Sequence, residues 1–435
     1  MHNFAPEITL ITILGLVIFS DALAKRFQIP SVFLLLIGSF VVYNYIPFAV
    51  PIDMKLYFDA IILFCIPLIF MGDALHLHFS DIKKYSWDIF YLAIIAVAIS
   101  ISVGASFYYL GIFEGLTLGA YVSLFAINMA TDAVSVQSIL SRFKGISHQI
   151  KVLIEGESLG NDATAVIAFF FIGLPWMMSG DIDPLVASYD ALRVFIVSLG
   201  IGIAIGFVFY MLMKLFSDKR GELFAFIVEA YLAYVVAEQM HVSGILTLII
   251  AIIATKAWID LDLKEIEDGD AKKSKNFMHK IRLGTINTTT KERLDYIYEM
   301  AKEFGYIAAV MIFFVLADMV SLEKLWEYKA EILIMFVITT VIRAISMAKF
   351  VFIGDRFRGI APVGKEGWFI LTFSGMKGAL SIILVHLIPD SYEHKEFFEV
   401  VTTGVVMMSI FVYGTVLWAY FRFFKVEEEP KSLFQ

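Results

Sequence analysis

Long apolar segments recur along almost the whole of this sequence, and they constrain its fold more than any other feature. A helix needs about 20 largely apolar residues to cross the hydrocarbon core of a bilayer, which is about 30 Å thick. The segments that approach this length are 7–24, 30–48, 57–73, 87–111, 115–140, 150–175, 190–216, 222–239, 242–258, 303–320, 329–353, 367–388 and 398–422. The pattern predicts an all-α, polytopic membrane protein with about 13 transmembrane helices.

The composition agrees with a membrane location. Hydrophobic residues make up 59% of the 435 residues and charged residues 17%, whereas soluble proteins average about 45–50% and about 25%. A soluble domain of this length needs more polar residues to keep its surface in water, so most soluble enzyme folds are excluded. The net charge of −8 and the lack of a long basic run argue against a nucleic-acid partner. Cys65 is the single cysteine, which excludes an intramolecular disulfide.

Lysine and arginine gather in alternate loops, and this sets the expected orientation of the chain. Cytoplasmic loops of membrane proteins carry an excess of these residues. The basic loops contain Lys25 and Arg26; Lys83 and Lys84; Arg142, Lys144 and Lys151; Lys219 and Arg220; and Arg356, Arg358 and Lys365. We therefore expect the N-terminus outside and the C-terminus in the cytoplasm, in the inner membrane of a prokaryote. No lysine or arginine precedes the first segment, so we expect a retained span there and no cleaved signal peptide.

Four charged residues lie deep within the apolar segments. Each lies about ten positions from the cytoplasmic end of its segment, which is about 15 Å along a helix and near the middle of the bilayer. They are Asp132, Asp162, Arg343 and Lys377. Ionisable side chains inside a membrane are costly and mark functional sites by default. The sequence therefore predicts a polar site at mid-membrane.

The segment 150–175 carries several oxygen-bearing side chains on one helical turn. Ser158 and Asp162 are four residues apart and share a face of the helix. Glu157 and Asn161 have the same spacing. Carboxylate, hydroxyl and amide oxygens suit an alkali cation or a proton better than a soft transition metal. We therefore expect a cation or proton site on this segment.

Two other segments carry residues that favour an interrupted helix. Thr131 and Asp132, in the fifth segment, compete for backbone hydrogen bonds and can cap a broken helix. Gly375 and Gly378, in the twelfth, permit a second break. Paired interrupted helices at corresponding positions of two halves indicate a transporter with its site at the midplane.

Three motifs together resemble the sodium/proton antiporters of the NhaP and NHE type, within the monovalent cation/proton antiporter superfamily. In chain order they are Thr131-Asp132, Glu157-Ser158-x-x-Asn161-Asp162 and Gly375-Met376-Lys377-Gly378-Ala379. The last is similar to the family's Gly-Leu-Arg-Gly-Ala element, and Arg343 falls where the family has an arginine. The resemblance covers the whole apolar region, and the Glu-Ser-x-x-Asn-Asp element is its most specific part.

The sequence departs from the family pattern at three positions. Ala133 follows Thr-Asp where the family usually has proline, so the break there must form without a missing N–H. Lys377 replaces the usual arginine and cannot pair with a carboxylate in the same bidentate way. Asp73 stands where many relatives have glutamate. These departures leave the class unchanged but leave ion preference and kinetics open.

The resemblance implies an NhaA-like antiporter fold with inverted-topology repeats, in which the interrupted helices of 115–140 and 367–388 cross. It also implies a core domain that moves against a dimerisation domain, so a homodimer is expected. The expected parts are dimerisation-side helices in 1–86 and 176–258, core repeats in 87–175 and 321–422, a charged cytoplasmic loop in 259–302, a further helix in 303–320 and a cytoplasmic tail in 423–435.

The resemblance further implies a secondary transporter, not an enzyme, that exchanges Na⁺ or Li⁺ for H⁺ by alternating access and needs no cofactor. Asp162 would bind the cation and the proton in competition. The other expected cation-site residues are Thr131, Asp132, Ser158 and Asn161. Glu157 and Arg343 would form a structural ion pair. Lys377 would offset the partial charge at a broken helix end.

Several alternatives stay open. Asn161 stands where electrogenic relatives have aspartate, so the resemblance implies one-for-one, electroneutral exchange. A K⁺/H⁺ antiporter of the same fold is the nearest alternative, because selectivity depends on cavity size, which the sequence does not give. An intramembrane aspartyl protease also uses two aspartates, but it expects Gly-x-Gly-Asp where this chain has Leu159-Gly160-Asn161-Asp162. An ion channel would differ by a flux that does not saturate.

Overall fold

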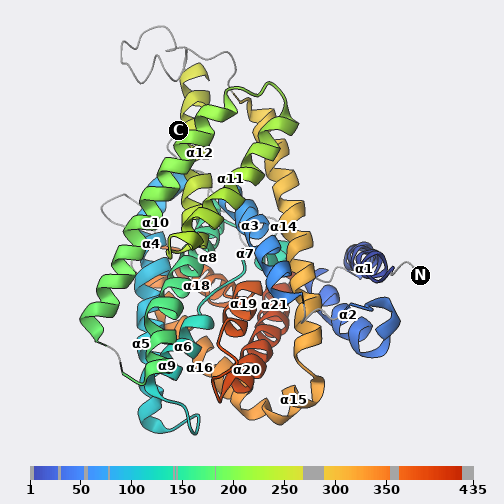
Figure 1. Cartoon of the computed structure of the whole chain (residues 1–435), viewed down its shortest axis with the longest axis vertical. Coiled ribbons are helices and arrows are strands. Elements are labelled where there is room, and N and C mark those ends of the chain that lie inside the picture. Colours follow the sequence, from blue (N-terminus) through green and yellow to red (C-terminus); the bar gives the residue numbers. More distant parts are fainter. Residues whose placement is uncertain are drawn as a thin grey trace. The chain divides into compact units, whose positions relative to one another are not determined.

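The computed structural model describes residues 4–27, 31–52, 57–76, 79–140, 143, 146–181, 183–267, 289–352 and 362–423. These residues form helices joined by short connections, and no β-strand occurs among them (Figure 1). The prediction of an all-α protein is therefore confirmed. Residues 268–288 of the expected cytoplasmic loop and residues 424–435 of the expected tail lie outside the described residues.

Each apolar segment of the sequence contains at least one helix. Up to the first interruption these are α1 (Ala5–Phe27), α2 (Ser31–Tyr45), α3 (Phe58–His76), α4 (Phe79–Phe90), α5 (Ala96–Ser106) and α6 (Leu118–Ile127). The next are α7 (Ala133–Leu140), α8 (His148–Ala168), α9 (Leu174–Ser179), α10 (Pro184–Met213), α11 (Lys219–Gln239) and α12 (Gly244–Glu267). The last are α14 (Lys291–Met319), α15 (Leu322–Glu327), α16 (Lys329–Met347), α17 (Lys349–Phe352), α18 (Gly364–Phe373), α19 (Ala379–His386), α20 (Lys395–Met408) and α21 (Gly414–Phe423).

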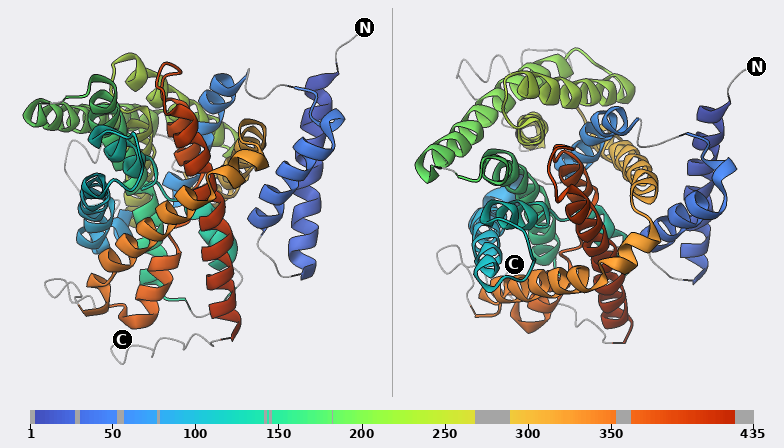
Figure 2. Two further views of the ribbon diagram at one scale, coloured as in Figure 1. Left: turned by 90° about the horizontal axis from the view of Figure 1, so that it is seen from below. Right: turned by 60° about the horizontal axis from the view of Figure 1, so that its bottom comes forward.

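Long helices in the described part of the chain contain π-helical turns. These are η2 (Tyr91–Ile95), η4 (Phe169–Gly173) and η6 (Ser409–Tyr413). Such turns are rare and often occur at functional sites. The run α20–η6–α21 continues through its π turn as one rod, coloured red in Figure 2. The turn therefore changes the direction of side chains without ending the helix.

Seven helical stretches among the described residues are long and apolar enough to cross a membrane. They are Ala5–Ala24, Asp81–Leu110, His148–Ser179, Leu185–Met213, Gly244–Leu263, Lys329–Val351 and Lys395–Phe423. Shorter apolar helices lie at Phe33–Tyr45, Ala60–His76 and Leu118–Ile127. The chain is therefore a multi-pass membrane protein, while the expected total of about 13 spans stays a prediction.

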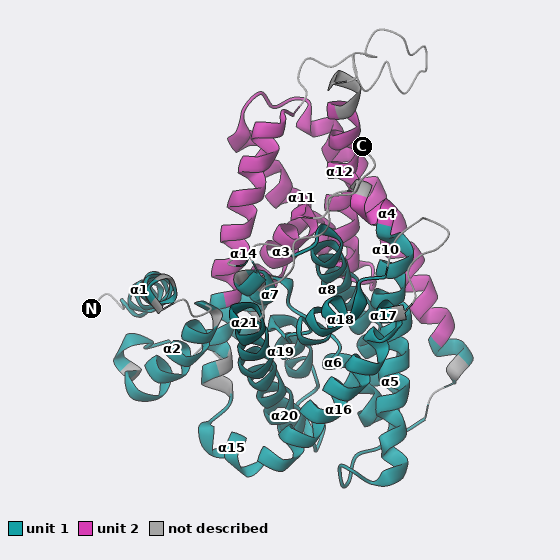
Figure 3. Cartoon of the chain, turned by 180° about the vertical axis from the view of Figure 1, so that it is seen from behind, with its two compact units in different colours: residues 1–62, 85–187, 310–435 teal, residues 63–84, 188–309 magenta. Residues whose placement is uncertain are grey.

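The chain divides into two compact units (Figure 3). Unit 1 comprises residues 1–62, 85–187 and 310–435, and unit 2 comprises residues 63–84 and 188–309. Both interrupted helices lie in unit 1, together with every candidate site residue of the sequence. Unit 2 contains α11, α12 and most of α10 and α14.

The described ends of the charged segment 259–302 are largely helical. Helix α12 continues beyond the apolar stretch to Glu267, and α14 begins at Lys291, well before its own apolar stretch. Ile259 and Asp262 on α12 are buried, as are apolar residues in the first turns of α14. Because a few side chains at helical spacing still find buried positions, both helices extend past the ends of their apolar runs.

Two helices of unit 1 are interrupted where the sequence predicted it. Residues 128–132 separate α6 from α7, and residues 374–378 separate α18 from α19. Each break leaves backbone N–H and carbonyl groups without partners in its own helix. In an apolar environment these groups need partners from elsewhere in the protein, and those partners form the site described next.

Candidate functional site

The first interruption is tied to helix α8 through Asp162. The backbone N–H of Thr131 donates a hydrogen bond to Oδ1 of Asp162, with an N···O distance of 3.1 Å. Both side chains are buried, and Asp162 is only 5% exposed. A carboxyl group that accepts a backbone N–H at a broken helix is held at a defined position. The structure thus brings together two residues that are 31 positions apart.

Ser158 bonds to both sides of the same break. Its hydroxyl donates to the carbonyl oxygen of Thr131 at 2.6 Å and accepts from the N–H of Ala133 at 3.0 Å. One side chain of α8 therefore satisfies an unpaired carbonyl and an unpaired N–H of the broken helix. The N–H that alanine retains at position 133 is used here, whereas a proline would lack it.

Asn161 contacts the side chain of Thr131. Its Nδ2 donates to Oγ1 of Thr131 at 2.9 Å. Asn161 is 2% exposed, and it lies one position from Asp162 on α8. The threonine is therefore held at its backbone N–H, its carbonyl and its hydroxyl by three side chains of one helix.

Asp132 connects the two interruptions. Its backbone N–H donates to the carbonyl oxygen of Met376 at 2.8 Å. Its side chain accepts a hydrogen bond from Ser135, and a Cβ atom on Gly378 would overlap the aspartate's own Cβ. Glycine is needed at position 378 because the second break passes against Asp132. A second link runs from the hydroxyl of Ser381 to the carbonyl of Ile127 at 2.8 Å.

Glu157 and Arg343 form a buried, bidentate ion pair. The two N···O distances are 2.5 Å, from Nη1 to Oε1, and 2.9 Å, from Nη2 to Oε2. The guanidinium also donates to the carbonyls of Leu371 and Thr372, at 2.7 and 2.9 Å, in the last turn of α18. It packs so closely on Gly375 that a Cβ there would overlap it. Arg343 therefore pairs with a carboxylate of α8 and also caps the C-terminal end of α18.

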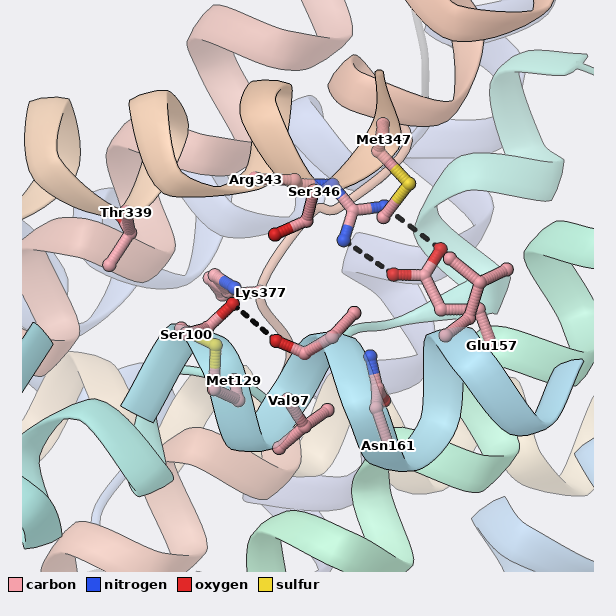
Figure 4. A pocket seen from close by; sticks show the side chains of 12 residues that line it. Val97, Ser100, Met129, Glu157, Asn161, Thr339, Arg343, Ser346, Met347 and Lys377 are labelled. Carbon is pink, nitrogen blue, oxygen red and sulfur yellow. Dashed lines mark hydrogen bonds and ion pairs between the residues drawn. The ribbon is translucent and has the colours of Figure 1, made fainter. Parts of the chain in front are cut away.

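Lys377 lies in the second interruption and faces a small cavity. Its backbone N–H donates to Oγ of Ser409, in the π turn η6, at 2.8 Å. The side chain is 4% exposed and lines the cavity together with Asn161, Glu157 and Arg343 (Figure 4). The cavity volume of about 20 Å³ is enough for one or two water molecules. Lys377 thus lines the same small cavity as both members of the ion pair.

Comparison with known protein families decides the class of this fold and site. A family model described as "Sodium/hydrogen exchanger, transmembrane" matches residues 8–422. The chain belongs to the sodium/hydrogen exchanger family. The resemblance drawn from the sequence motifs is therefore confirmed.

Several sodium/proton antiporters are similar to this member of the family. The Na⁺/H⁺ antiporter ApNhaP of Aphanothece halophytica is 27% identical over 357 residues, which cover 82% of this chain and 62% of the relative. The Na⁺/H⁺ antiporter NhaH of Halobacillus aidingensis is 24% identical over 436 residues, which cover 96% of this chain and 98% of the relative. The chain thus spans less than two thirds of the length of ApNhaP but nearly all of NhaH.

A solved antiporter shares the fold. The structure of the sodium proton antiporter MjNhaP1 from Methanocaldococcus jannaschii at pH 8 superposes with a TM-score of 0.72 and 14% sequence identity. The superposition covers 96% of each chain. At this identity the match shows the fold alone, and it agrees with the antiporter fold class predicted from the motifs.

Some residues of this candidate site could not be found from the sequence. Ser135 stands one helical turn after Asp132, a spacing that could have marked it as a partner. Nothing in the position of Ser409 marks it as a partner of Lys377. Ser381 binds a carbonyl at the other interruption, a contact between residues 254 positions apart. Serines are common in packed membrane helices, so their type alone gives no signal.

The site offers mixed oxygen ligands. Carboxylates, hydroxyls and a backbone carbonyl converge at the first interruption, from Asp162, Ser158 and Thr131. Among the described residues, no group of three or more His, Cys, Asp or Glu side chains is placed to hold a metal ion. Oxygen sites with few carboxylates and no nitrogen or sulfur ligand suit a hard monovalent cation or a proton.

Proposed function

We propose that this protein is a secondary antiporter that exchanges Na⁺ for H⁺ across the cell membrane. Its family and the names of its similar proteins support this activity. The observation that carries the proposal for the site is the buried carboxyl of Asp162, held by the N–H of Thr131 at a helix interruption. Buried ionisable groups at broken helices are typical of transporter ion sites.

Competition at a single carboxyl would couple the two ions. Asp162 can carry a proton or, when ionised, a Na⁺ ion, because protonation removes the negative charge that attracts the cation. If the protein changes between its inward-open and outward-open states only when Asp162 carries an ion, each cation that is released must be replaced by a proton before the site can return. The oxygens of Thr131, Asp132 and Ser158 would complete the cation shell, with Asn161 holding Thr131 in place.

The Glu157–Arg343 pair is proposed to hold the site together and not to bind the ion. The pair is complete within itself, and the remaining guanidinium N–H groups bind carbonyls of α18. Lys377 is proposed to offset the partial negative charge at the end of that half-helix. Because Asn161 supplies no second carboxylate beside Asp162, we propose one-for-one, electroneutral exchange.

The wider arrangement follows the family resemblance. We propose that the core repeats in 87–175 and 321–422 move during alternating access and that the dimerisation-side helices in 1–86 and 176–258 form a homodimer. The N-terminus would lie outside and the C-terminus in the cytoplasm, as the basic loops indicate. No cofactor is required, because the ion gradients supply the driving force.

The decisive experiment uses proteoliposomes with a pH-sensitive dye inside. Na⁺, Li⁺ and K⁺ gradients are applied in turn, with and without valinomycin to clamp the membrane potential. We expect Na⁺-driven proton movement that saturates and does not depend on the clamp. Asp162→Asn should abolish it, while Glu155→Gln should not, because Glu155 on the same helix binds Gln137 away from the site.

Each alternative predicts a different result. A response to K⁺ alone would favour the K⁺/H⁺ antiporter, and a flux that rises without saturation would favour a channel. Cleavage of a transmembrane peptide in detergent, lost in Asp162→Asn, would favour the aspartyl protease. Robust exchange by a folded Asp162→Asn protein would contradict the proposed mechanism.

A further inference from the structure

Helix α11 carries two fully buried glutamates with different surroundings. Glu222 and Glu229 are both 0% exposed and lie about two helical turns apart. Glu222 has a cationic partner, because Nη1 of Arg293 lies 2.7 Å from its Oε1 and Thr289 donates to the same oxygen at 3.1 Å. Its burial is therefore compatible with an ionised carboxylate. All of these residues belong to unit 2.

Glu229 has no cationic partner within the described part of unit 2. Its one hydrogen bond joins Oε1 to Oγ1 of Thr255 on α12, over 2.5 Å. Its Oε2 has no hydrogen-bond partner among the described residues, as is also true of Oε2 of Glu222, so the two glutamates differ in their cationic partner. An ionised carboxylate in such a position would be a buried charge with one neutral hydrogen-bond donor. Its free energy is higher than that of the protonated carboxyl, because an unpaired charge is costly away from water.

The hydroxyl of Thr255 gives an independent indication. Its Oγ1 lies 2.9 Å from the carbonyl oxygen of Gly206 on α10 as well as 2.5 Å from Glu229. A hydroxyl has one proton to donate, and the carbonyl has none. If Glu229 is ionised, its carboxylate and the Gly206 carbonyl must share the single proton of Thr255. Two full hydrogen bonds form when Thr255 donates to Gly206 and the carboxyl of Glu229 donates to Thr255. That arrangement requires a protonated Glu229.

The backbone of α10 is brought close to Thr255 by glycine. A Cβ atom on Gly206 would lie 2.7 Å from the carbonyl oxygen of Ala251, and one on Gly202 would lie 2.7 Å from that of Thr247. Close approach of membrane helices through small residues is a common packing mode. Here it places the Gly206 carbonyl within reach of a threonine on the neighbouring helix.

We propose that Glu229 is a proton-binding site separate from the ion site of unit 1, and that its proton stays bound as a structural ligand. The proton joins three helices in one chain of hydrogen bonds, from Glu229 on α11 to Thr255 on α12 to the Gly206 carbonyl on α10. Its ligand is H⁺, because Thr255 is the one hydrogen-bond partner of this carboxyl among the described residues and a metal cation needs several oxygen ligands. The inference does not depend on the proposed exchange activity.

Infrared spectroscopy of the full-length protein in lipid tests the protonation directly. A buried protonated carboxyl has a C=O stretching band separated from that of carboxylates. We expect Glu229→Gln to remove one such band at neutral pH. Glu222→Gln is the matched control, and we expect it to leave the protonated bands unchanged because Glu222 has a cationic partner, Arg293, 2.7 Å away. Loss of a carboxylate band in Glu229→Gln would overturn the proposal.

Thermal stability and exchange test the structural role. A glutamine amide can donate to Thr255 as a protonated carboxyl does, so Glu229→Gln should keep the wild-type melting temperature and exchange rate. Glu229→Leu and Thr255→Val should both lower the melting temperature, because each removes the link. Loss of exchange in a folded Glu229→Gln protein would contradict the proposal that the proton stays bound. Equal melting temperatures of Glu229→Gln and Glu229→Leu would contradict the proposed chain of hydrogen bonds.

Discussion

The backbone N–H of Thr131 donates a hydrogen bond to Oδ1 of Asp162 over 3.1 Å. This bond joins a broken helix to a continuous one, since α8 runs without interruption from His148 to Ala168. The carboxyl of Asp162 is therefore bound directly to a residue of the first interruption. Any rearrangement of the interruption changes the surroundings of Asp162 directly, and this makes the residues around the break the best targets for mutation.

Ser158→Ala should weaken cation binding and stability together. The change removes the donor to the Thr131 carbonyl and the acceptor of the Ala133 N–H. Leaving such buried groups unpaired costs about 1–3 kcal/mol each. We expect a lower melting temperature and a raised half-saturating Na⁺ concentration in the dye assay. Ser39→Ala, a buried serine that bonds within its own helix α2, is the control and should behave as wild type.

Gly378→Ala should disrupt transport more than most glycine substitutions. The new methyl group would overlap the Cβ of Asp132, so one of the two breaks must shift. We expect loss of most exchange activity in reconstituted vesicles. Gly200→Ala serves as the comparison, because nothing lies within 4 Å of a Cβ at that exposed position of α10. Normal exchange by Gly378→Ala would show that the contact with Asp132 is unimportant.

Breaking the Glu157–Arg343 pair should damage folding. Removing one partner of a buried ion pair costs about 3–5 kcal/mol, because the other charge stays buried. Glu157→Gln should therefore lower the melting temperature strongly. The double variant Glu157→Gln with Arg343→Met leaves no unpaired buried charge, so it should recover part of the lost stability. It should not recover the part that comes from the hydrogen bonds of Arg343 to the carbonyls at the end of α18. A double variant as unstable as the sum of both single variants would argue against coupling.

Ala133→Pro should leave the fold intact and change ion binding. Proline is tolerated at the first position of a helix, and Ala133 begins α7. The substitution removes the N–H that binds Ser158, a bond worth about 0.5–1.5 kcal/mol. We expect a half-saturating Na⁺ concentration raised by up to about tenfold. Ala133→Ser retains the N–H and should match wild type, so an equal shift in both variants would point to another cause.

The candidate site residues stood out in the sequence because charges are rare in apolar segments. Asp132, Asp162, Arg343 and Lys377 stood out against their surroundings, and the structure places all of them around the two interruptions or the adjacent cavity. The spacing of Ser158 and Asp162 on one face of a helix also follows from local geometry. These features depend on residue type and helical period, which a single sequence contains.

The sequence could not give the contacts between distant segments. The capping of α18 by Arg343 and the bond from Ser409 to Lys377 arise from the packing of separate helices. The π turn that positions Ser409 also has no simple sequence signal. Ala133 illustrates the limit best, since it looked like a missing proline and its retained N–H binds Ser158.

The bonds from Asp132 to Met376 and from Ser381 to Ile127 run in opposite directions between the two interruptions. Asp132 in the first break donates to Met376 in the second, and Ser381 on α19, just after the second break, donates to Ile127 at the end of α6, just before the first. A shift in one break therefore disturbs the other. A substitution that disturbs residues 128–132 is therefore compensated most readily by a second substitution in residues 374–381. A genetic selection for second-site revertants should return substitutions from the opposite half of the chain.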